Sequence, residues 1–546
     1  MTTTRPLAGS WRLVRLAVRR DRTVLPVWIA SITVLTWAVV ASYAATVPTE
    51  ADRIATATLS ASNPMTRIFD GPASGASLGA MSLVEGYKVF AILTALMSAQ
   101  AIVRHTRADE ETGRAELLGS APVGRHARLC AALVLVLGAN LVLGVTTATA
   151  VAANGLAWSG AWAAGLAVAG TGWVFAGVAA VGAQVLSTAR GANAVAGGAL
   201  GVAFVLRAIG DLRGEITDGG LALVSAWPSW LSPLGWGQQI RPFYQDRWWI
   251  AGLFVALTAA LVAVAAMLTD RRDLGSGMVP ARRGPARASR WLISPLGLAW
   301  RIQRGVLLAW LVSVAVFGAV LGSMGDTLED YLAENATVRQ MLLSLSPDAD
   351  LMDLFFALIM ALVGLACAGY TVQALLRMRS EEVSGRLEPL LATAVGRRRW
   401  LIGHLLIAGA GTVLLLTVSG LASGLTYGAI TGHWTEGVGG FLAAALVQAP
   451  AALALGGLVL TVFGLLPRLA APITWSALAA ALVMGQLGAL LDLPQWLLDV
   501  SPFTHVPLVP AEAFTPGPVA ALCAAAILLG ALGVATFRRR DLVIGA

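Results

Sequence analysis

Two sixteen-residue segments hold the most regularly spaced charged side chains in the sequence. EETGRAELLGSAPVGR runs from Glu110 to Arg125, and EVSGRLEPLLATAVGR runs from Glu382 to Arg397. The segments agree at eight of sixteen positions, and both contain Gly-Arg-x-Glu in the same register. Carboxylates and guanidinium groups at this spacing can form ion pairs with a partner surface. The pattern favours docking, although descent from a duplicated ancestor would also preserve it.

Each segment is expected to form a short helix after a glycine. Gly113 and Gly385 follow acidic residues and permit a reversal of the chain that a side chain would resist. Pro122 suits the end of the first helix, and Pro389 suits the first turn of the second. The predicted docking residues are Glu110, Glu111, Gly113, Arg114 and Glu116 in the first segment and Glu382, Gly385, Arg386 and Glu388 in the second.

Other chemistry has little support. A phosphate-binding loop of the GxxxxGK[ST] type needs a lysine, and the only lysine, Lys88, follows Tyr87 in an apolar run. The five histidines lack metal-ligand spacing, and the three cysteines lie far apart in apolar stretches. We therefore expect no catalytic residue, no metal site and no cofactor bound by this chain.

Glu85 and Lys88 are the charged residues that stand out within an apolar run. They are three residues apart, so on a helix they share one face and are expected to pair with each other. The alternative is that they contact a substrate in a transport pathway, since charges inside a membrane usually have a function. Asp353 is a further carboxylate near a predicted outer end.

The composition is that of a membrane protein. Of 546 residues, 57% are hydrophobic and 12% are charged, and the mean hydropathy is +0.74. A bilayer core about 30 Å thick needs roughly 20 apolar residues per helix. Twelve such runs are predicted, at residues 23–45, 83–104, 129–152, 161–186, 191–209, 249–269, 304–324, 353–376, 401–430, 440–466, 469–491 and 517–537.

The net charge of +8 comes from arginines spread over many short loops. With both termini in the cytoplasm, most arginines fall in cytoplasmic segments, as the positive-inside rule requires. This spread argues against a nucleic-acid interface, which needs a contiguous basic face. The basic segment Ser10–Arg22 is expected to lie as a helix in the inner membrane interface, and ordinary flanking charge is the alternative.

The sequence reads as two copies of one unit. RRDL occurs at Arg271–Leu274 and again at Arg539–Leu542, after the sixth predicted span of each copy. Six spans are an even number, so the two halves are parallel repeats. The predicted boundaries are 1–274 for the first half, 275–290 for a cytoplasmic linker rich in Gly, Pro and Arg, and 291–546 for the second half. The expected fold is an all-α polytopic membrane protein.

The repeated segments, each between the second and third of six spans, resemble those of ABC-2 type (type V) exporter permeases. The sequence is most similar to the large fused permeases of actinobacterial antibiotic and multidrug efflux systems. The resemblance implies that residues 110–125 and 382–397 contain coupling helices, on which two copies of a separate ATPase subunit dock. That partner would bind ATP and Mg²⁺. The resemblance also implies a pathway lined by the first, second and fifth spans of each half.

The resemblance implies export of hydrophobic or amphiphilic compounds, such as antibiotics or drugs, across the cell membrane by a protein that is not itself an enzyme. Charge-poor spans suit such cargo, and they would equally suit a lipid or a lipid-linked precursor. A secondary transporter driven by an ion gradient is the alternative from a different class, because such proteins often have twelve spans in two halves.

Overall fold

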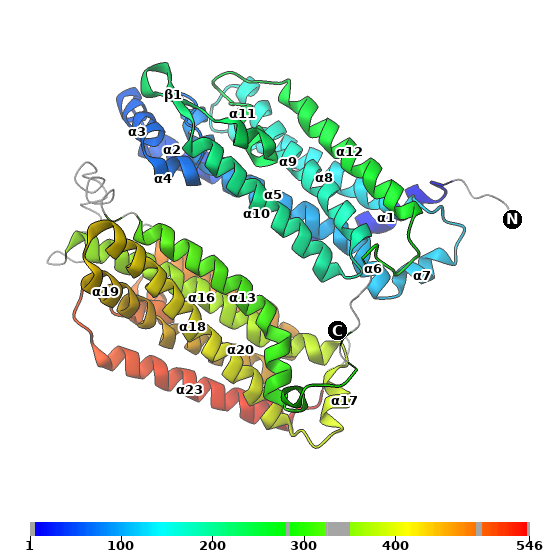
Figure 1. Cartoon of the computed structure of the whole chain (residues 1–546), viewed down its shortest axis with the longest axis vertical. Helices are drawn as coiled ribbons and strands as arrows, with labels where there is room; N and C mark the ends of the chain where they lie inside the picture. Colours follow the sequence, from blue (N-terminus) through cyan, green and yellow to red (C-terminus); the bar gives the residue numbers. More distant parts are fainter. Residues whose placement is uncertain are drawn as a thin grey trace. The chain divides into compact units, whose positions relative to one another are not determined.

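The computed structural model describes residues 6–279, 284, 286–323, 325, 350–487 and 494–542. Twelve described helices are long and apolar enough to cross a membrane. The prediction of an all-α polytopic membrane protein is therefore confirmed. The chain divides into two compact units, Met1–Gly284 and Pro285–Ala546, and each is described here by itself (Figure 1).

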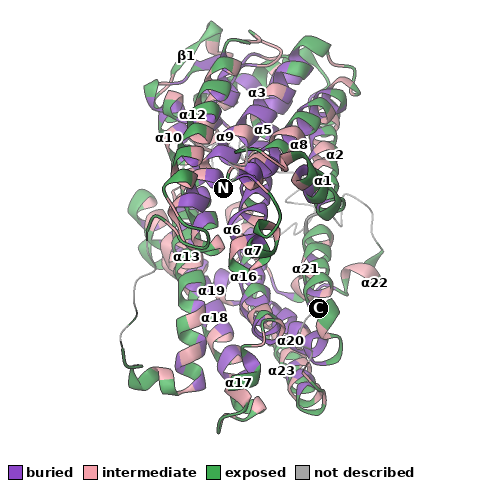
Figure 2. Cartoon of the chain, turned by 90° about the vertical axis from the view of Figure 1, so that its right-hand side faces the viewer, coloured by how far each residue is buried: buried purple, intermediate pink, exposed green. Residues whose placement is uncertain are grey.

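Six long helices make up most of unit 1. Among them α9 is central, because it packs against α5, α8, α10 and α12, and Figure 2 shows α5 and α9 as largely buried. The first long helix of the chain, α2, packs against α5 and α8. The six helices are α2 (Val24–Thr46), α5 (Leu78–His105), α8 (Ala127–Ala152), α9 (Trp158–Val185), α10 (Ala189–Leu212) and α12 (Ile250–Asp270).

Shorter elements cover the two ends of unit 1. At one end lie α1 (Ser10–Arg20), α6 (Arg107–Glu111) and α7 (Arg114–Gly119). The other end carries α3 (Glu50–Ser62), α4 (Pro64–Phe69), β1 (Glu215–Thr217), η1 (Asp218–Gly220), β2 (Ala222–Val224), η2 (Trp227–Leu231) and α11 (Pro233–Gln239). The strands β1 and β2 form an antiparallel pair in which Ile216 lies opposite Leu223.

Small residues let α8 and α9 approach closely. A Cβ atom added to Gly165 would lie 2.3 Å from the backbone oxygen of Gly144, which leaves no room for a side chain. In α10, by contrast, a Cβ atom added to Gly197, Gly198 or Gly201 would meet no described atom within 4 Å.

Unit 2 also contains six spans, the fourth of which is made of two helices. The spans are α13 (Pro295–Gly322), α16 (Leu351–Val383), α18 (Arg397–Thr431), α19 (Trp434–Leu446) with α20 (Ala449–Leu465), α21 (Ala470–Leu487) and α23 (Pro516–Arg539). The shorter elements are η3 (Arg290–Ile293), α17 (Leu387–Leu391), η4 (Pro467–Leu469), α22 (Gln495–Leu498) and η5 (Pro502–His505).

The two units differ where one helix is broken and its counterpart is not. Pro450 lacks an N–H group and its ring would clash with the carbonyl group four residues earlier, so α19 ends at Leu446 and α20 starts at Ala449. The corresponding helix of unit 1, α9, is continuous. At the first span it is unit 1 that has the break. There α1 and α2 are separated at Asp21–Thr23, whereas α13 of unit 2 is a single helix.

Candidate functional site: two charged loops and their anchors

The two repeated segments begin at the ends of the second spans, α5 and α16, and contain short helices. In unit 1 the chain leaves α6, turns at Gly113 and forms α7. In unit 2 it leaves α16, turns at Gly385 and forms α17. Gly113 has φ +72° and Gly385 has φ +69°, so both adopt the left-handed conformation that glycine permits. The reversal predicted at each glycine is confirmed.

One face of each short helix is exposed and charged. Arg114 and Glu116 of α7 are exposed, while Ala115 between them is buried. In the second copy Arg386 and Glu388 are exposed, and Leu387 between them is buried. Each short helix is thus anchored by one small or apolar side chain and presents an arginine and a glutamate to solvent.

Glu110 is not free to meet a partner, because two arginines of unit 1 hold it. Its side chain is only 4% exposed. Arg272 binds it through two bonds, from Nη2 to Oε1 at 2.6 Å and from Nη1 to Oε2 at 2.8 Å. Arg107 donates from Nη1 to Oε2 at 2.8 Å. Glu110 therefore anchors the loop, and its placement among the residues that dock is corrected.

Glu382 is held in the same way in unit 2. Its side chain is fully buried, and Arg540 donates from Nη1 to Oε1 at 2.5 Å and from Nη2 to Oε2 at 2.9 Å. Arg379 donates from Nη1 to Oε2 at 3.2 Å. We call each set of one glutamate and two arginines a Glu–Arg clamp. The second clamp corrects the prediction that the Glu382 carboxylate faces a partner.

The clamps explain why RRDL occurs twice. Arg272 follows the last span of unit 1, and Arg540 follows the last span of unit 2. Each is the second arginine of RRDL, so the repeated motif fixes the loop after the second span to the end of the sixth span. The sequence shows both motifs, but it does not show that they meet across 162 and 158 residues.

The surroundings of the clamps are polar in unit 1 and aromatic in unit 2. Arg272 donates from Nε to Oε1 of Gln184 at 2.6 Å, and Arg107 donates to the backbone oxygen of Ala183. In unit 2 the guanidinium group of Arg540 lies 4.8 Å from the ring centre of Phe463 and 5.0 Å from that of Phe537. The ion pairs have therefore been kept while the groups around them changed.

Glu111 also has a contact within the chain. It is exposed, and its Oε1 accepts a hydrogen bond from the backbone N–H of Ala189 at 2.9 Å. Ala189 is the first residue of α10, where N–H groups lack partners within the helix and an acidic side chain is stabilising. Glu111 thus links the loop to the start of the fifth span of unit 1.

Unit 1 contains further ion pairs that join α1 to the second span. Arg20 binds both oxygens of Asp109 at 2.7 and 2.8 Å. Asp21 accepts from Nη1 of Arg104 at 2.8 Å and lies 2.7 Å from Nε2 of His105. The sequence analysis did not single out Asp21, whose only signal was its position among arginines. In unit 2 a buried contact between Gln303 and His404 joins the first and third spans instead.

Lys88 pairs with Asp70, so the predicted pairing with Glu85 is wrong. Its Nζ atom donates to Oδ1 of Asp70, which follows α4. Glu85 is exposed, and the described residues give it no salt bridge to Lys88. The helix α5 starts at Leu78, whereas the span was predicted to start at residue 83. Lys88 therefore lies about 15 Å along the helix from its first residue.

A second charged pair lies in α10, on either side of residue 209, where that span was predicted to end. Arg207 and Asp211 are both buried, and Nη1 of Arg207 lies 3.4 Å from Oδ2 of Asp211. Arg207 also donates to the backbone oxygens of Ile68 and Phe69. The prediction that the spans are poor in charge took no account of this pair, although Arg207 lies within the predicted span 191–209 and Asp211 lies just beyond its end.

The comparisons with known proteins agree on the kind of protein. Residues 292–538 match the family model "Multidrug efflux system permease Rv1217c, C-terminal domain". The chain is 39% identical over 534 residues to the multidrug efflux system permease protein Rv1217c of Mycobacterium tuberculosis (strain ATCC 25618 / H37Rv). That similarity covers 98% of this chain and 95% of the relative.

Proposed function

The chain belongs to the family of multidrug efflux system permeases, and we propose that it is the membrane subunit of an ATP-driven exporter of the ABC-2 type. As a permease it is a multi-pass membrane protein that transports rather than an enzyme. Two copies of a separate ATPase subunit would bind ATP and Mg²⁺ and dock on α7 and α17. The cargo would be a hydrophobic or amphiphilic compound such as an antibiotic or drug.

The observation that carries the proposal is the duplicated arrangement of loop and clamp. Each unit presents an arginine and a glutamate on a short exposed helix, and each ties the adjacent loop to its own last span through a buried carboxylate. A solvated loop does not require such an anchor. A loop that a partner must move does require an anchor, because force applied to an unanchored loop would bend the loop and leave the spans in place.

The clamps suggest how a partner could switch the transport pathway. Movement of α7 or α17 would be transmitted through Glu110 to Arg272, or through Glu382 to Arg540, and so from the second span to the sixth span of the same unit. The ATPase would need to bind one arrangement of these helices more tightly than the other, since a partner can shift an equilibrium only by that difference.

The test is to reverse the exposed charges while leaving the clamps intact. Arg114→Glu with Glu116→Arg, combined with Arg386→Glu and Glu388→Arg, should weaken association with the co-expressed ATPase at least tenfold and abolish drug efflux. Any one of these changes alone should have a small effect, because an exposed ion pair contributes about 0–1 kcal/mol. Binding can be measured by co-purification and efflux by accumulation of a fluorescent drug.

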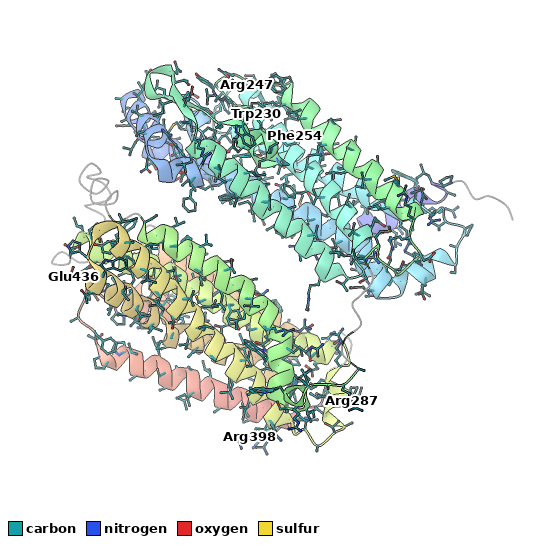
Figure 3. The ribbon with its side chains drawn as sticks, viewed as in Figure 1. Trp230, Arg247, Phe254, Arg287, Arg398 and Glu436 are labelled. Atoms are coloured by element: carbon teal, nitrogen blue, oxygen red, sulfur yellow. The ribbon has the colours of Figure 1, made fainter. Side chains whose placement is uncertain are left out.

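Arg287→Glu is the matched control, because Arg287 is an exposed arginine near the start of unit 2 and lies outside α17 (Figure 3). That variant should bind the ATPase and export drug normally. If the fourfold variant also keeps normal export, or if the purified chain hydrolyses ATP alone, the proposed docking of an ATPase is wrong.

An ion-coupled secondary transporter is the rival function, and two charged pairs of unit 1, one half-buried and one buried, are the observation in its favour. The pairs Lys88 with Asp70 and Arg207 with Asp211 place two cations and two anions among helices. Both pairs are neutral in sum, which is typical of structural ion pairs in a membrane. Efflux that collapses with the proton gradient while ATP is kept constant would favour this rival.

A further inference from the structure

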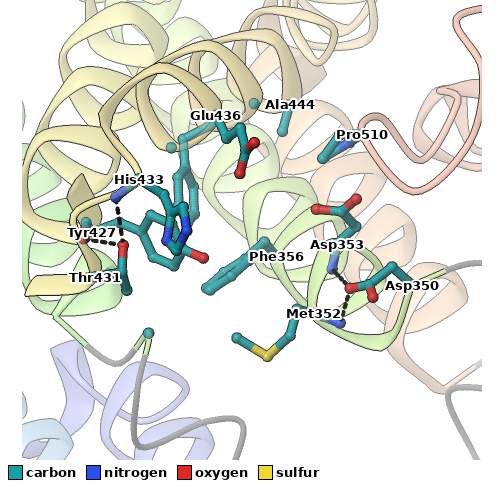
Figure 4. A pocket seen from close by; sticks show the side chains of 14 residues that line it. Asp350, Met352, Asp353, Phe356, Tyr427, Thr431, His433, Glu436, Ala444 and Pro510 are labelled. Atoms are coloured by element: carbon teal, nitrogen blue, oxygen red, sulfur yellow. Dashed lines mark hydrogen bonds between the residues drawn. The ribbon is translucent and has the colours of Figure 1, made fainter.

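A cavity of about 440 Å³ lies at the end of unit 2 opposite α17, outside the loops and clamps. It is formed by the start of α16, the end of α18 and the start of α19 (Figure 4). Asp350, Asp353 and Glu436 contribute carboxylates, and Phe356, Tyr427 and Phe441 contribute aromatic rings. Glu436 marks this end of the unit in Figure 3, where Arg398 marks the other end.

The three carboxylates give the cavity a negative charge. Asp353 interacts electrostatically with both Asp350 and Glu436, so its carboxylate is close enough to be repelled by each of them. Among the described residues, none of the three forms a salt bridge with an arginine or lysine. Asp350 has a structural role as well, since its Oδ1 accepts from the backbone N–H groups of Met352 and Asp353 at the start of α16.

The aromatic wall is built from rings that contact one another edge to face. The ring centres of Phe356 and Phe441 are 4.5 Å apart, and that of Tyr427 lies 5.6 Å from Phe356 and 5.7 Å from Phe441. The side chains of Phe356 and Phe441 are almost fully buried, whereas Tyr427 is partly exposed. Faces of aromatic rings attract cations, and apolar matter packs well against them.

Unit 1 fills the corresponding space with a ring of its own. The helices α9 and α19 both start at a tryptophan, Trp158 and Trp434, so Gly160 corresponds to Glu436. In unit 1 the ring of Phe243 lies against Gly160 and against Gly79 at the start of α5, within 2.6 Å of where a Cβ atom of either glycine would stand. Phe243 has φ +63°, a conformation that is costly for a residue with a large side chain.

The comparison of the two units identifies the kind of occupant. Where unit 1 inserts a phenylalanine ring at the expense of backbone strain, unit 2 leaves a cavity lined by acidic residues. In unit 1, the positions 272 residues before Asp350, Asp353 and Phe356 are occupied by Leu78, Met81 and Val84. The charges of unit 2 are therefore not a feature that both copies share.

We propose that this cavity binds an organic cation that carries an aromatic ring, with the ring in the space that Phe243 fills in unit 1 and the charge near the carboxylates. A metal ion fits less well, because among the described residues no three His, Cys, Asp or Glu side chains are placed to share one. The inference rests on the efflux function of the family and names a class of compound for it, but it does not depend on ATP.

Binding of tetraphenylphosphonium to the purified full-length chain tests the proposal. This probe has a permanent positive charge and four phenyl rings, and triphenylphosphine oxide is a neutral comparator with three. We expect the cation to bind at least tenfold more tightly than the neutral compound in equilibrium dialysis, after subtraction of its partition into protein-free micelles. Equal affinity for the two probes would overturn the proposal.

Variants of the cavity decide where the cation binds. Glu436→Gln with Asp353→Asn should weaken tetraphenylphosphonium binding about tenfold or more, because the charge that attracts the cation is removed. Gly440→Phe should block binding by filling the space beside Pro510, the only described residue within 4 Å of an added Cβ. Asp350 is left unchanged because it caps α16. Glu512→Gln, an exposed position of unit 2 outside the cavity lining, is the control and should bind normally.

The outcomes separate this inference from the proposed exporter. Unchanged binding in both cavity variants, or displacement of the probe by Ca²⁺ at equal concentration, would overturn the cation site even if ATP-driven efflux is demonstrated. Loss of binding in the two cavity variants, but not in Glu512→Gln, would support the site even if no ATPase docks on α7 and α17.

Discussion

At the scale of single residues, the Glu–Arg clamps are the feature with the largest expected energetic effect. Glu382→Ala would leave the guanidinium group of Arg540 without its carboxylate in a place where Glu382 is fully buried. Removing one partner of a buried pair costs about 3–5 kcal/mol. We expect a loss of that size in the free energy of unfolding, measured by chemical denaturation in detergent micelles.

Two further variants show whether that loss comes from the clamp. Glu382→Ala with Arg540→Met should cost less than the sum of the single changes, since Met keeps the apolar contacts with Phe463 and Phe537 and leaves no charge behind. The exposed Glu388→Ala should change stability by no more than about 1 kcal/mol. Equal losses for Glu382→Ala and Glu388→Ala would contradict a structural role for the clamp.

The sequence revealed the glutamate and the RRDL arginine of each clamp but not their pairing. The register of Glu110 with Glu382, and of the two RRDL motifs, is visible when the halves are compared. Which arginine meets which carboxylate is a tertiary contact between residues more than 150 positions apart, and single-sequence patterns report only neighbours along a helix or strand. The same limit explains the wrong partner for Lys88, because Asp70 lies outside its helix.

At the scale of elements, the direction of α7 depends on the left-handed turn at Gly113. Gly113→Ala should destabilise the loop by about 1 kcal/mol, since an L-residue pays roughly that much to adopt this conformation. The cost is conformational only, because an added Cβ meets no described atom within 4 Å. We expect faster amide hydrogen exchange in residues 110–120 and weaker ATPase binding.

Gly119→Ala is a matched control for that change. Gly119 also has open space around it, but it is the last residue of α7 and does not have a positive φ. Alanine favours a helix more than glycine does, so hydrogen exchange in the same residues should be unchanged or slower. If both alanine variants speed up exchange equally, the left-handed turn does not position α7.

The spans themselves were largely predictable, and their interruptions were not. Each of the twelve predicted apolar runs falls on one of the twelve candidate spans, because a bilayer core requires continuous apolar runs of helical length. Most ends agree within a few residues, but α13 starts at Pro295 rather than at 304 and α16 ends at Val383 rather than at 376. The break between α19 and α20 was missed, since Pro450 lies inside an apolar run and a proline there can kink a helix or end it. The continuity of α13 was also missed, because its basic residues resemble those that precede α2.

At the scale of the whole molecule, the orientation in the membrane assigns a side to every feature described above. The arginine-rich segments lie next to α1, α7 and α17 and after α12 and α23. By the positive-inside rule, these ends should face the cytoplasm. The exposed helices α7 and α17 would then be accessible to a cytoplasmic ATPase, and the acidic cavity of unit 2 would open toward the outside of the cell.

Reporter fusions test this orientation directly. A phosphatase reporter that is active only outside the cytoplasm should be inactive when fused after Arg125 and active when fused within residues 326–350, most of which lie outside the described residues. A fusion after Arg397 should match the first, because the two halves are expected to be parallel. The reverse pattern would place α7 and α17 outside the cell, where no ATP is available, and would exclude a cytoplasmic ATPase. Activity after only one of Arg125 and Arg397 would mean that the halves are inverted, and the two clamps would then face opposite sides of the membrane.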